Sequence, residues 1–303
     1  YGIATAYAKE GCNLVLTGRN MQKLEDAKEE LEKLYGIEVL AVQADVSAGA
    51  DNTAVVNNVV KQAIDKFGRI DVLINNAQAS ASGVTLADHT IEQFDLAVYS
   101  GLYATFHYMQ ACYPYLAKTQ GSVINFASGA GLFGNFGQCA YAAAKEGIRG
   151  LTRVAATEWG KDGINVNVVC PLAWTAQLEG FEKAYPEAFK ANVHMPPMGH
   201  YGDAEQEIGR VCVQLANPDF KYMTGETLTL EGGMGQSCGN CGKLPQTLDP
   251  PAFWPLDKLW NEADFIHTPV EKILIPLYIR PPCAGFLPPG DAYAAYFFAK
   301  IAV

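Results

Sequence analysis

Residues 70–77 read Ile-Asp-Val-Leu-Ile-Asn-Asn-Ala, and this stretch decides the fold. The aliphatic run Val72 to Ile74 has no polar alternation, which is typical of a strand buried on both faces. Asn75 and Asn76 end the run at once, and a long helical pattern follows from Ile91 to about Ala117. The stretch therefore predicts a buried strand that leads through a loop into a covering helix.

The same alternation repeats on both sides of this unit. Short apolar runs alternate with amphipathic helical patterns, which predicts a parallel sheet covered on both faces, an α/β doubly wound fold of the Rossmann type. We expect one domain over residues 1–235. We expect a poorly ordered, irregular extension over 236–303, because it holds most of the chain's 16 prolines. The alternative is a docking segment that covers a partner subunit. The further runs lie at 14–16, 39–42, 123–124, 164–169 and 227–230, and the further helical patterns at 21–35, 53–67 and 138–159.

The composition and net charge narrow the classes of protein to which this chain can belong. The chain has 303 residues, of which 49% are hydrophobic and 18% charged, as in an ordinary globular enzyme. Its net charge of −10 argues against nucleic acid and anionic membranes as partners. No apolar run approaches the roughly 18 residues that a membrane span needs. The eight cysteines are mostly isolated and no secretory segment is visible, so we expect a reduced, cytoplasmic protein. Because the chain opens directly on a helical pattern at Tyr1, we expect a fragment.

One cysteine pair, Cys238 and Cys241, requires separate consideration. A zinc site needs four ligands, and nearby the sequence offers only Cys283 and His267 in addition. A redox pair would need a helix start inside a βαβ unit, which this region lacks. We predict no metal site.

The candidate reaction centre begins with Tyr141 and Lys145, four residues apart on one face of a helix. A phenol ionises near pH 10, so acid–base work near neutrality needs a nearby cation, which Lys145 can supply. Thirteen residues before Tyr141, Ser128 ends a strand and opens a glycine-rich loop. Its hydroxyl could hydrogen-bond a substrate carbonyl. A second copy of the pattern, Tyr296 to Lys300, has no such serine.

A nucleotide cofactor is predicted at the carboxyl ends of the strands. Gly2 and Ile3 open a helix where the end of a glycine-rich phosphate-binding turn could stand. Arg19 follows the strand where an NAD enzyme would place an acid, and a guanidinium suits a 2′-phosphate. This favours NADP, with NAD as the alternative. Arg19 could also be a solvated helix-capping charge. Asp45 and Val46 could contact the adenine or form a cap.

In their order along the chain, these motifs resemble the short branch of the short-chain dehydrogenase/reductase family over residues 1–235. The motifs are Gly2-Ile3, Asn75-Asn76-Ala77, Ser128, Tyr141-x-x-x-Lys145, Pro171 with Thr175, and the closing segment from Gly225 to Gly233.

The resemblance implies hydride transfer between NADP(H) and a carbonyl or secondary alcohol. It makes Tyr141 the general acid in reduction and Ser128 the group that polarises the carbonyl. It also implies that Lys145 lowers the pKa of Tyr141 and holds the nicotinamide ribose, and that the protein forms a homodimer or homotetramer. The cofactor-binding set is Gly2, Ile3, Arg19, Asp45, Val46, Asn76, Ala77, Tyr141, Lys145, Pro171 and Thr175.

Four departures from the family pattern stand out. The first strand and most of the glycine-rich turn are missing. Gly101 stands where the family has an Asn that holds a water in its proton relay. Gln78 and Leu172 replace glycines beside the nicotinamide and after Pro171, which indicates a reshaped substrate pocket.

The substrate side is expected to be apolar. The segment from Trp174 to His200 occupies the place of the family's variable lid and is rich in aromatic and Met residues, which suits an apolar or cyclic ketone, although part of it could simply pack the lid on the core. His194 is expected to be a surface or lid residue. The predicted substrate contacts are Gln78, Phe133, Gln138, Leu172 and Trp174.

The leading hypothesis is an NADP-dependent carbonyl reductase or alcohol dehydrogenase. The alternative from another class is a non-catalytic nucleotide-binding or assembly module with the same fold. A lyase or epimerase that uses the same Tyr and Lys usually has a dedicated substrate domain, which the extension does not resemble.

Overall fold

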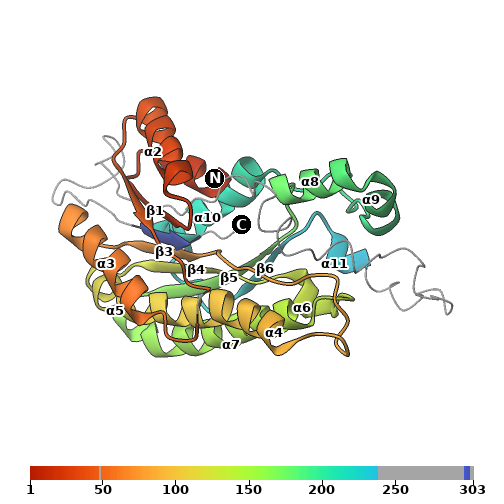
Figure 1. The fold of residues 1–303 in the computed structure, drawn as a ribbon. Helices are drawn as coiled ribbons and strands as arrows, with labels where there is room; N and C mark the ends of the chain where they lie inside the picture. The colour runs from red at the N-terminus through yellow and green to blue at the C-terminus, as the bar shows by residue number, and fades with distance from the viewer. Residues whose placement is uncertain (48, 238–296, 301–303) are drawn as a thin grey trace.

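The computed structural model describes residues 1–47, 49–237 and 297–300 and shows one parallel sheet between two layers of helices (Figure 1). The strand order is β2-β1-β7-β3-β4-β5-β6. The predicted doubly wound α/β fold is therefore confirmed. The strands are β1 (Leu14–Gly18), β2 (Val39–Gln43), β3 (Val72–Asn75), β4 (Ser122–Phe126), β5 (Asn165–Pro171), β6 (Thr227–Leu230) and β7 (Phe297–Lys300).

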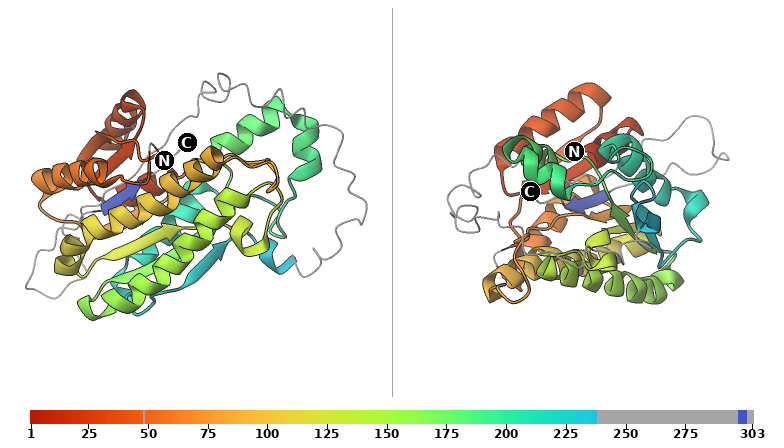
Figure 2. Two further views of the ribbon diagram at one scale, coloured as in Figure 1. Left: turned by 60° about the horizontal axis from the view of Figure 1, so that its bottom comes forward. Right: turned by 90° about the vertical axis from the view of Figure 1, so that its right-hand side faces the viewer.

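The helices cover both faces of this sheet. Figure 2 shows α3, α5 and α7 on one face, and α1, α2 and α10 lie on the other. The α-helices are α1 (Gly2–Lys9), α2 (Met21–Tyr35), α3 (Thr53–Phe67), α4 (Ile91–Ala97), α5 (Ala104–Thr119), α6 (Gly129–Phe133), α7 (Cys139–Trp159), α8 (Ala176–Ala184), α9 (Pro186–Asn192), α10 (Arg210–Leu215) and α11 (Met234–Ser237). Two π-helices, η1 (Val98–Tyr103) and η3 (Ala204–Gly209), and two 3₁₀ turns, η2 (Gly160–Asp162) and η4 (Pro218–Phe220), complete the described part.

The central strands form the core. Every residue of β1, β3 and β4 is buried, as their unbroken apolar runs predict for strands covered on both faces. Local signals set the helix ends. Asn20 caps α2 by accepting a hydrogen bond from the Lys23 N–H, and Gly36 ends it at φ 67°, a left-handed conformation that glycine adopts without strain.

The strand β7 lies at the centre of the sheet and corrects one sequence prediction. No strand was expected within residues 297–300, because residues 236–303 were expected to be poorly ordered. In the structure, Phe297 pairs with both Leu14 of β1 and Val72 of β3, and Lys300 pairs with Asn75. The pattern did not reveal this because a four-residue run gives a weak signal among prolines. Residues 238–296 and 301–303 of the extension, with Cys238, Cys241 and Tyr296, lie outside the described residues.

The long helix expected from Ile91 to about Ala117 is an unbroken helical stretch that ends at Thr119, but its hydrogen bonding is not α-helical throughout. Its middle, Val98 to Tyr103, is the π-helix η1, which separates α4 from α5. The sequence pattern did not show it, because a short π-helical segment inside a longer helix has no residue signature of its own.

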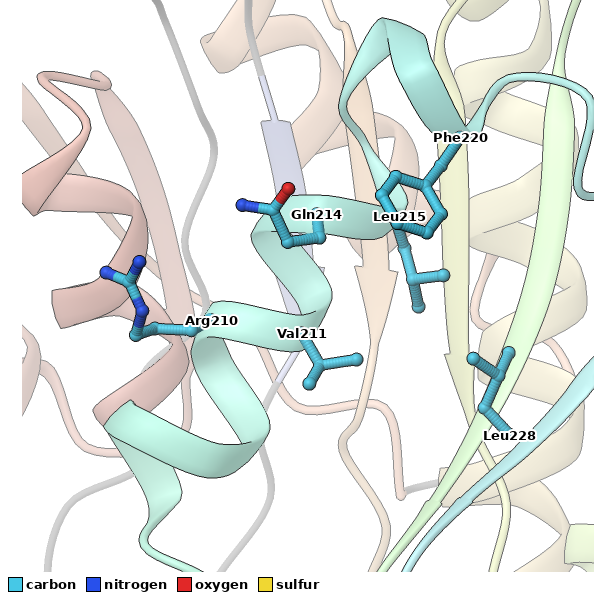
Figure 3. Close-up of a pocket in the computed structure, with 6 residues that line it drawn as sticks. All are labelled: Arg210, Val211, Gln214, Leu215, Phe220 and Leu228. Atoms are coloured by element: carbon cyan, nitrogen blue, oxygen red, sulfur yellow. The ribbon is translucent and has the colours of Figure 1, made fainter.

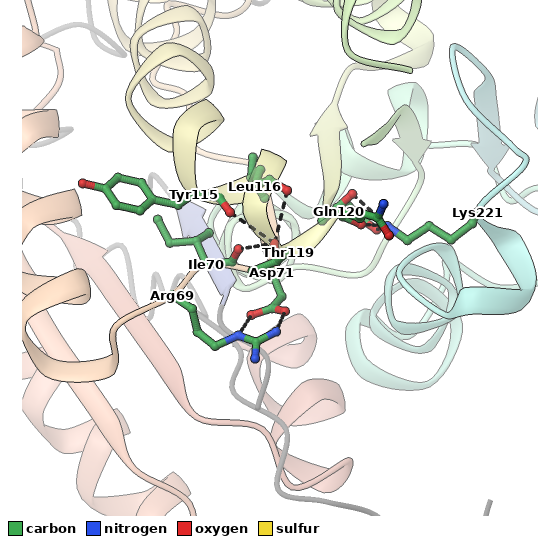
Figure 4. A network of polar contacts seen from close by, with 10 residues as sticks. Arg69, Ile70, Asp71, Tyr115, Leu116, Thr119, Gln120 and Lys221 are labelled. Carbon is green, nitrogen blue, oxygen red and sulfur yellow. Dashed lines mark hydrogen bonds and ion pairs between the residues drawn. The ribbon is translucent and has the colours of Figure 1, made fainter. Parts of the chain in front are cut away.

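A polar network holds the amino-terminal edge of the sheet, the edge opposite the predicted site (Figure 4). The Lys221 ammonium donates to the Gly121 carbonyl at 2.8 Å and to the Ser122 hydroxyl at 3.1 Å. The Thr119 hydroxyl donates to the Ile70 carbonyl at 2.7 Å. These bonds hold the starts of β3 and β4 in place, and they thereby help to set the position of the carboxyl ends of both strands at the predicted site.

Candidate active site

The carboxyl ends of the parallel strands bring most of the predicted site residues to one edge of the sheet. Arg19 follows β1, Asp45 follows β2 and Asn76 follows β3. Ser128 follows β4, and Thr175 follows β5. In doubly wound folds this edge is where ligands bind, so the topology supports the predicted crevice.

Ser128 is positioned by the break between β4 and α6. Its backbone is extended, with φ −158° and ψ 148°, and it is the N-cap of α6. Its hydroxyl oxygen accepts a hydrogen bond from the Ala130 N–H at 3.1 Å. This bond holds the oxygen at the helix start, and the Ser128 hydroxyl also forms a hydrogen bond with the Tyr141 side chain.

Tyr141 and Lys145 lie together in the first two turns of α7. The Lys145 Nζ atom is 5.3 Å from the centre of the Tyr141 ring. Lys145 is buried, and its ammonium donates a hydrogen bond of 2.8 Å to the carbonyl of Phe126, the last residue of β4. The lysine thus ties the catalytic helix to the strand that leads to Ser128. The sequence could not indicate this contact, because any residue supplies a backbone carbonyl.

Burial dominates the electrostatics of this pair. It raises the pKa of Tyr141, and the hydrogen bond with Ser128 opposes this rise only partly. Burial also lowers the pKa of Lys145 to about 7. The expectation that Lys145 lowers the pKa of Tyr141 therefore stays a prediction for the protein with bound cofactor. Both groups have lost solvent, and desolvation favours the neutral form of each. A further positive charge at the site would favour the phenolate.

The residues present fit a nucleotide cofactor. Arg19 is exposed beside the carboxyl end of β1, and its carbonyl accepts a 2.7 Å hydrogen bond from the Gln43 amide, which fixes the loop. Asn76 is half-buried after β3, whereas Asn75 points into the core and donates to Asn125 at 2.9 Å. The Arg19 guanidinium, the Asn76 amide and the Lys145 side chain all lie at this end of the sheet. Such groups match the phosphates and ribose hydroxyls of a nucleotide cofactor.

Other predicted cofactor residues have local roles. A Cβ on Gly2 would lie 2.4 Å from the backbone of Ala204, so close packing of α1 on η3 already requires this glycine. Ile3 is buried, and only its backbone could face a ligand. The Asp45 carboxylate accepts bonds of 2.8 and 2.6 Å from Ser47.

The remaining predicted cofactor residues lie along the same edge. Thr175 caps α8 by accepting a hydrogen bond from the Leu178 N–H. Val46 and Ala77 are buried, and Pro171 ends β5.

Aromatic residues from three parts of the chain meet on the substrate side. The Trp174 ring packs edge to face against the rings of Phe189 and Tyr201, each with centroids 6.1 Å apart. Phe133, at the end of α6, keeps 41% of its surface exposed, and Met195 in the lid keeps 55%. Exposed apolar side chains of this kind suit an apolar ligand.

Two predicted substrate contacts are held by loop hydrogen bonds. The Gln138 amide oxygen accepts from the Ser82 hydroxyl at 3.1 Å. Leu172 donates its N–H to Leu230 at 2.8 Å and accepts from the Gly202 N–H at 2.9 Å. Gln78 lies against η1, on the far side of the loop from Gln138.

A hollow of about 290 Å³ lies elsewhere, between α10 and β6 (Figure 3). No predicted site residue lines it, so it is not the reaction site. Within residues 1–47, 49–237 and 297–300, no cluster of His, Cys, Asp or Glu could hold a metal ion, and no helix could cross a membrane. The lining residues of the hollow are Arg210, Val211, Gln214, Leu215, Phe220 and Leu228.

Comparison with known proteins agrees with this geometry. The family model described as Enoyl-(Acyl carrier protein) reductase matches residues 1–235. The 12alpha-hydroxysteroid dehydrogenase of Clostridium sp. (strain ATCC 29733 / VPI C48-50) is 72% identical over 236 residues, which cover 78% of this chain and 91% of that protein.

Two solved structures of related proteins contain nucleotides. ElxO with NADP bound is 27% identical, with a TM-score of 0.66 over 73% of this chain and 88% of its own. An NAD⁺-bound xylitol dehydrogenase is 25% identical, with a TM-score of 0.67 over 77% of this chain and 95% of its own. Similar folds therefore hold either nucleotide.

Proposed function

Since the chain belongs to the short-chain dehydrogenase/reductase family, whose enzymes transfer hydride between NAD(P) and CH–OH groups, we propose that it is an NADP-dependent hydroxysteroid dehydrogenase that acts at a 12α-hydroxyl group. The observation that carries the proposal is the 72% identity to a 12alpha-hydroxysteroid dehydrogenase over 236 residues, which cover 91% of that protein. A steroid nucleus is the apolar, cyclic substrate that the exposed Phe133 and Met195 favour.

The reaction centre would act on the steroid oxygen. When bound, NADPH would be the source of the hydride that reduces the carbonyl carbon. The Tyr141 hydroxyl gives its proton to the carbonyl oxygen, and the Ser128 hydroxyl donates a hydrogen bond to that oxygen and holds it in place. The phenolate regains its proton from solvent, so the net change is carbonyl plus hydride plus proton to alcohol. Lys145, fixed by Phe126, would hold the cofactor ribose beside Tyr141.

NADP preference rests on Arg19. No acidic side chain stands directly at the carboxyl end of β1, where an NAD enzyme would bind the ribose hydroxyls, and an exposed guanidinium stands there instead. Asp45, the acid after the neighbouring strand, already accepts two bonds from Ser47.

The non-catalytic alternative is weaker. A binding or assembly module has no need of a buried lysine tied to the strand before Ser128, nor of a tyrosine one helical turn from it. A buried ionisable group with a strongly lowered pKa in such a place favours catalysis.

We further expect a homodimer or homotetramer in the cytoplasm. Phe106 on α5 and Val154 on α7 are exposed apolar residues on neighbouring helices, which suits contact with a second copy. The five cysteines described are all unpaired, which suits a reducing compartment. Light scattering on the purified protein measures the oligomeric state.

The function is tested with a matched pair of steroids, one with a 12α-hydroxyl group and one identical except that it lacks this group. With NADP⁺ in excess, we expect the first to form NADPH and a 12-oxo product and the second to form neither. NAD⁺ should give a lower kcat/KM. Equal turnover of both steroids would refute the position assigned. Tight NADPH binding without turnover of either would instead support the non-catalytic alternative.

A further inference from the structure

The π-helix η1 adjoins the reaction centre. It packs against α7, the helix that carries Tyr141 and Lys145. π-turns shift the backbone hydrogen bonds of a helix and are frequent at functional sites. Gly101 lies in this π-helix and is fully buried, so the space that a side chain would take there belongs to a neighbour.

Hydrogen bonds join the loop after β3 to η1 and to Ala97, the last residue of α4. The Ala79 N–H donates to the Ser100 hydroxyl at 2.9 Å, and that hydroxyl lies 3.1 Å from the Ala79 carbonyl. The Gln78 amide nitrogen donates to the Ala97 carbonyl at 3.3 Å, at the junction of α4 and η1. Gln78 is thus the side chain that connects the loop to the start of the π-helix.

Gln78 and Gly101 share a single space. A Cβ built on Gly101 would lie 2.6 Å from the Gln78 Cδ atom, 2.7 Å from its Oε1 and 3.0 Å from its Nε2. The terminal amide of Gln78 therefore fills the volume next to Gly101, and any side chain at position 101 would displace it. Gln78 and Gly101, which the sequence analysis treated as separate departures from the family pattern, therefore form one structural feature.

The buried oxygen of this amide lacks a donor. Gln78 Oε1 is inaccessible to solvent and has no hydrogen-bond partner among the residues that the structure describes. Its orientation is fixed, because turning the amide would bring two oxygens together at Ala97. An unsatisfied buried acceptor is unfavourable, and a buried water commonly satisfies one.

The other end of the same loop reaches the start of the catalytic helix. The Gly83 N–H donates to the Gly137 carbonyl at 2.8 Å, and the Ser82 hydroxyl donates to Gln138, three residues before Tyr141. The segment from Gln78 to Gly83 therefore spans from η1 to the start of α7. Anything that fixes its first residue also fixes the wall of the site beside Tyr141.

We propose that Gln78 is a positioning residue for the reaction: its carboxamide, seated over Gly101, holds this loop on η1, and its Oε1 accepts a hydrogen bond from one internal water molecule. The proposal rests on the proposed function, because it assigns Gln78 to the same site. It explains why a bulky amide at position 78 and a glycine at position 101 occur together.

The test is a reciprocal exchange. Gln78→Gly removes the amide, and Gly101→Asn forces a second side chain into the space that the Gln78 amide fills. In the double variant, the amide of the new Asn at position 101 can occupy the space that Gln78 has left. We expect each single variant to lower kcat by about 10- to 100-fold, with KM for the steroid changed less than about twofold, because the Gln78 amide is hydrogen-bonded at the start of η1 and acts on the reaction only through the loop. The double variant should recover kcat to within about fivefold of the wild type.

Two further measurements keep the outcome clear. Gln78→Met keeps the length of the side chain but removes the amide, and it should lose kcat as Gln78→Gly does while keeping its Tm within a few degrees. A thermal-unfolding cycle of the two singles and the double needs no substrate, and Gly101→Asn should lower Tm much less when Gln78→Gly is also present. The proposal would be overturned if the effects of the two single variants were additive both on kcat and on Tm, or if Gln78→Met kept the kcat of the wild type. If the wild type does not turn over either steroid but the changes in Tm of the two single variants are not additive, only the proposed function would be rejected.

Discussion

The buried amine of Lys145 should make the stability of the cofactor-free protein depend on pH in a defined window. Its pKa is about 7 in the folded protein against 10.5 as the ordinary value. Between these two values the unfolded chain binds one proton more than the folded chain, so the free energy of unfolding rises with pH by about 1.4 kcal/mol per pH unit. At pH values below both pKa values, the free energy of unfolding is about 5 kcal/mol lower than at pH values above both, because the buried amine is then protonated in the folded protein as well.

Replacing Lys145 with Met removes this titration. The difference in unfolding free energy, wild type minus Lys145→Met, should therefore increase by about 3 kcal/mol between about pH 7.5 and about pH 9.5. Denaturant unfolding at both pH values measures it, provided that the m-values agree. Lys183→Met is the matched control, because the Lys183 side chain is 73% exposed and its variant should show a constant difference. A constant difference for Lys145→Met would refute the burial argument.

The remaining predictions concern the cofactor and the sheet. Arg19→Ala should raise KM for NADPH by about 10-fold or more and leave KM for NADH nearly unchanged, since only NADPH carries the 2′-phosphate; equal effects on both would overturn the NADP assignment. Phe298→Pro should lower Tm by about 5 °C or more, because proline removes a backbone N–H from the central strand β7. Phe298→Val, which keeps the N–H, is its control, and an unchanged Tm in the proline variant would show that the pairing of β7 does not contribute to stability.

The fold could be predicted from the sequence where burial leaves a chemical pattern. Fully buried strands must be apolar throughout, so Val72 to Ile74 and the runs beside them identified the sheet. The π-helix at Val98–Tyr103 could not be predicted, because it changes hydrogen-bond spacing but not side-chain chemistry. The pairing of Phe297 with Leu14 and Val72 depends on contacts between distant parts of the chain, which local patterns do not encode.

The site shows the same division. The spacing of Tyr141 and Lys145 on one helix, with Ser128 at a strand end, was readable because it is local. The pKa values of Tyr141 and Lys145 could not be predicted from the sequence, since they depend on how completely the folded chain buries the two groups. The packing of Gly2 on Ala204 could not be predicted from the sequence either, because it joins distant parts of the chain; the cofactor contact expected at Gly2 stays a prediction.

The central claim is that Ser128, Tyr141 and Lys145 form a working reaction centre, and Tyr141→Phe tests it most directly. Single-turnover reduction of a 12-oxo steroid should be measured with NADPH already bound, beside a fluorescence titration of NADPH on the same variant. We expect NADPH affinity within about threefold of the wild type and a hydride-transfer rate at least about 1,000-fold lower, because the phenol that protonates the carbonyl oxygen is gone. Reduction at the wild-type rate by Tyr141→Phe would contradict the account.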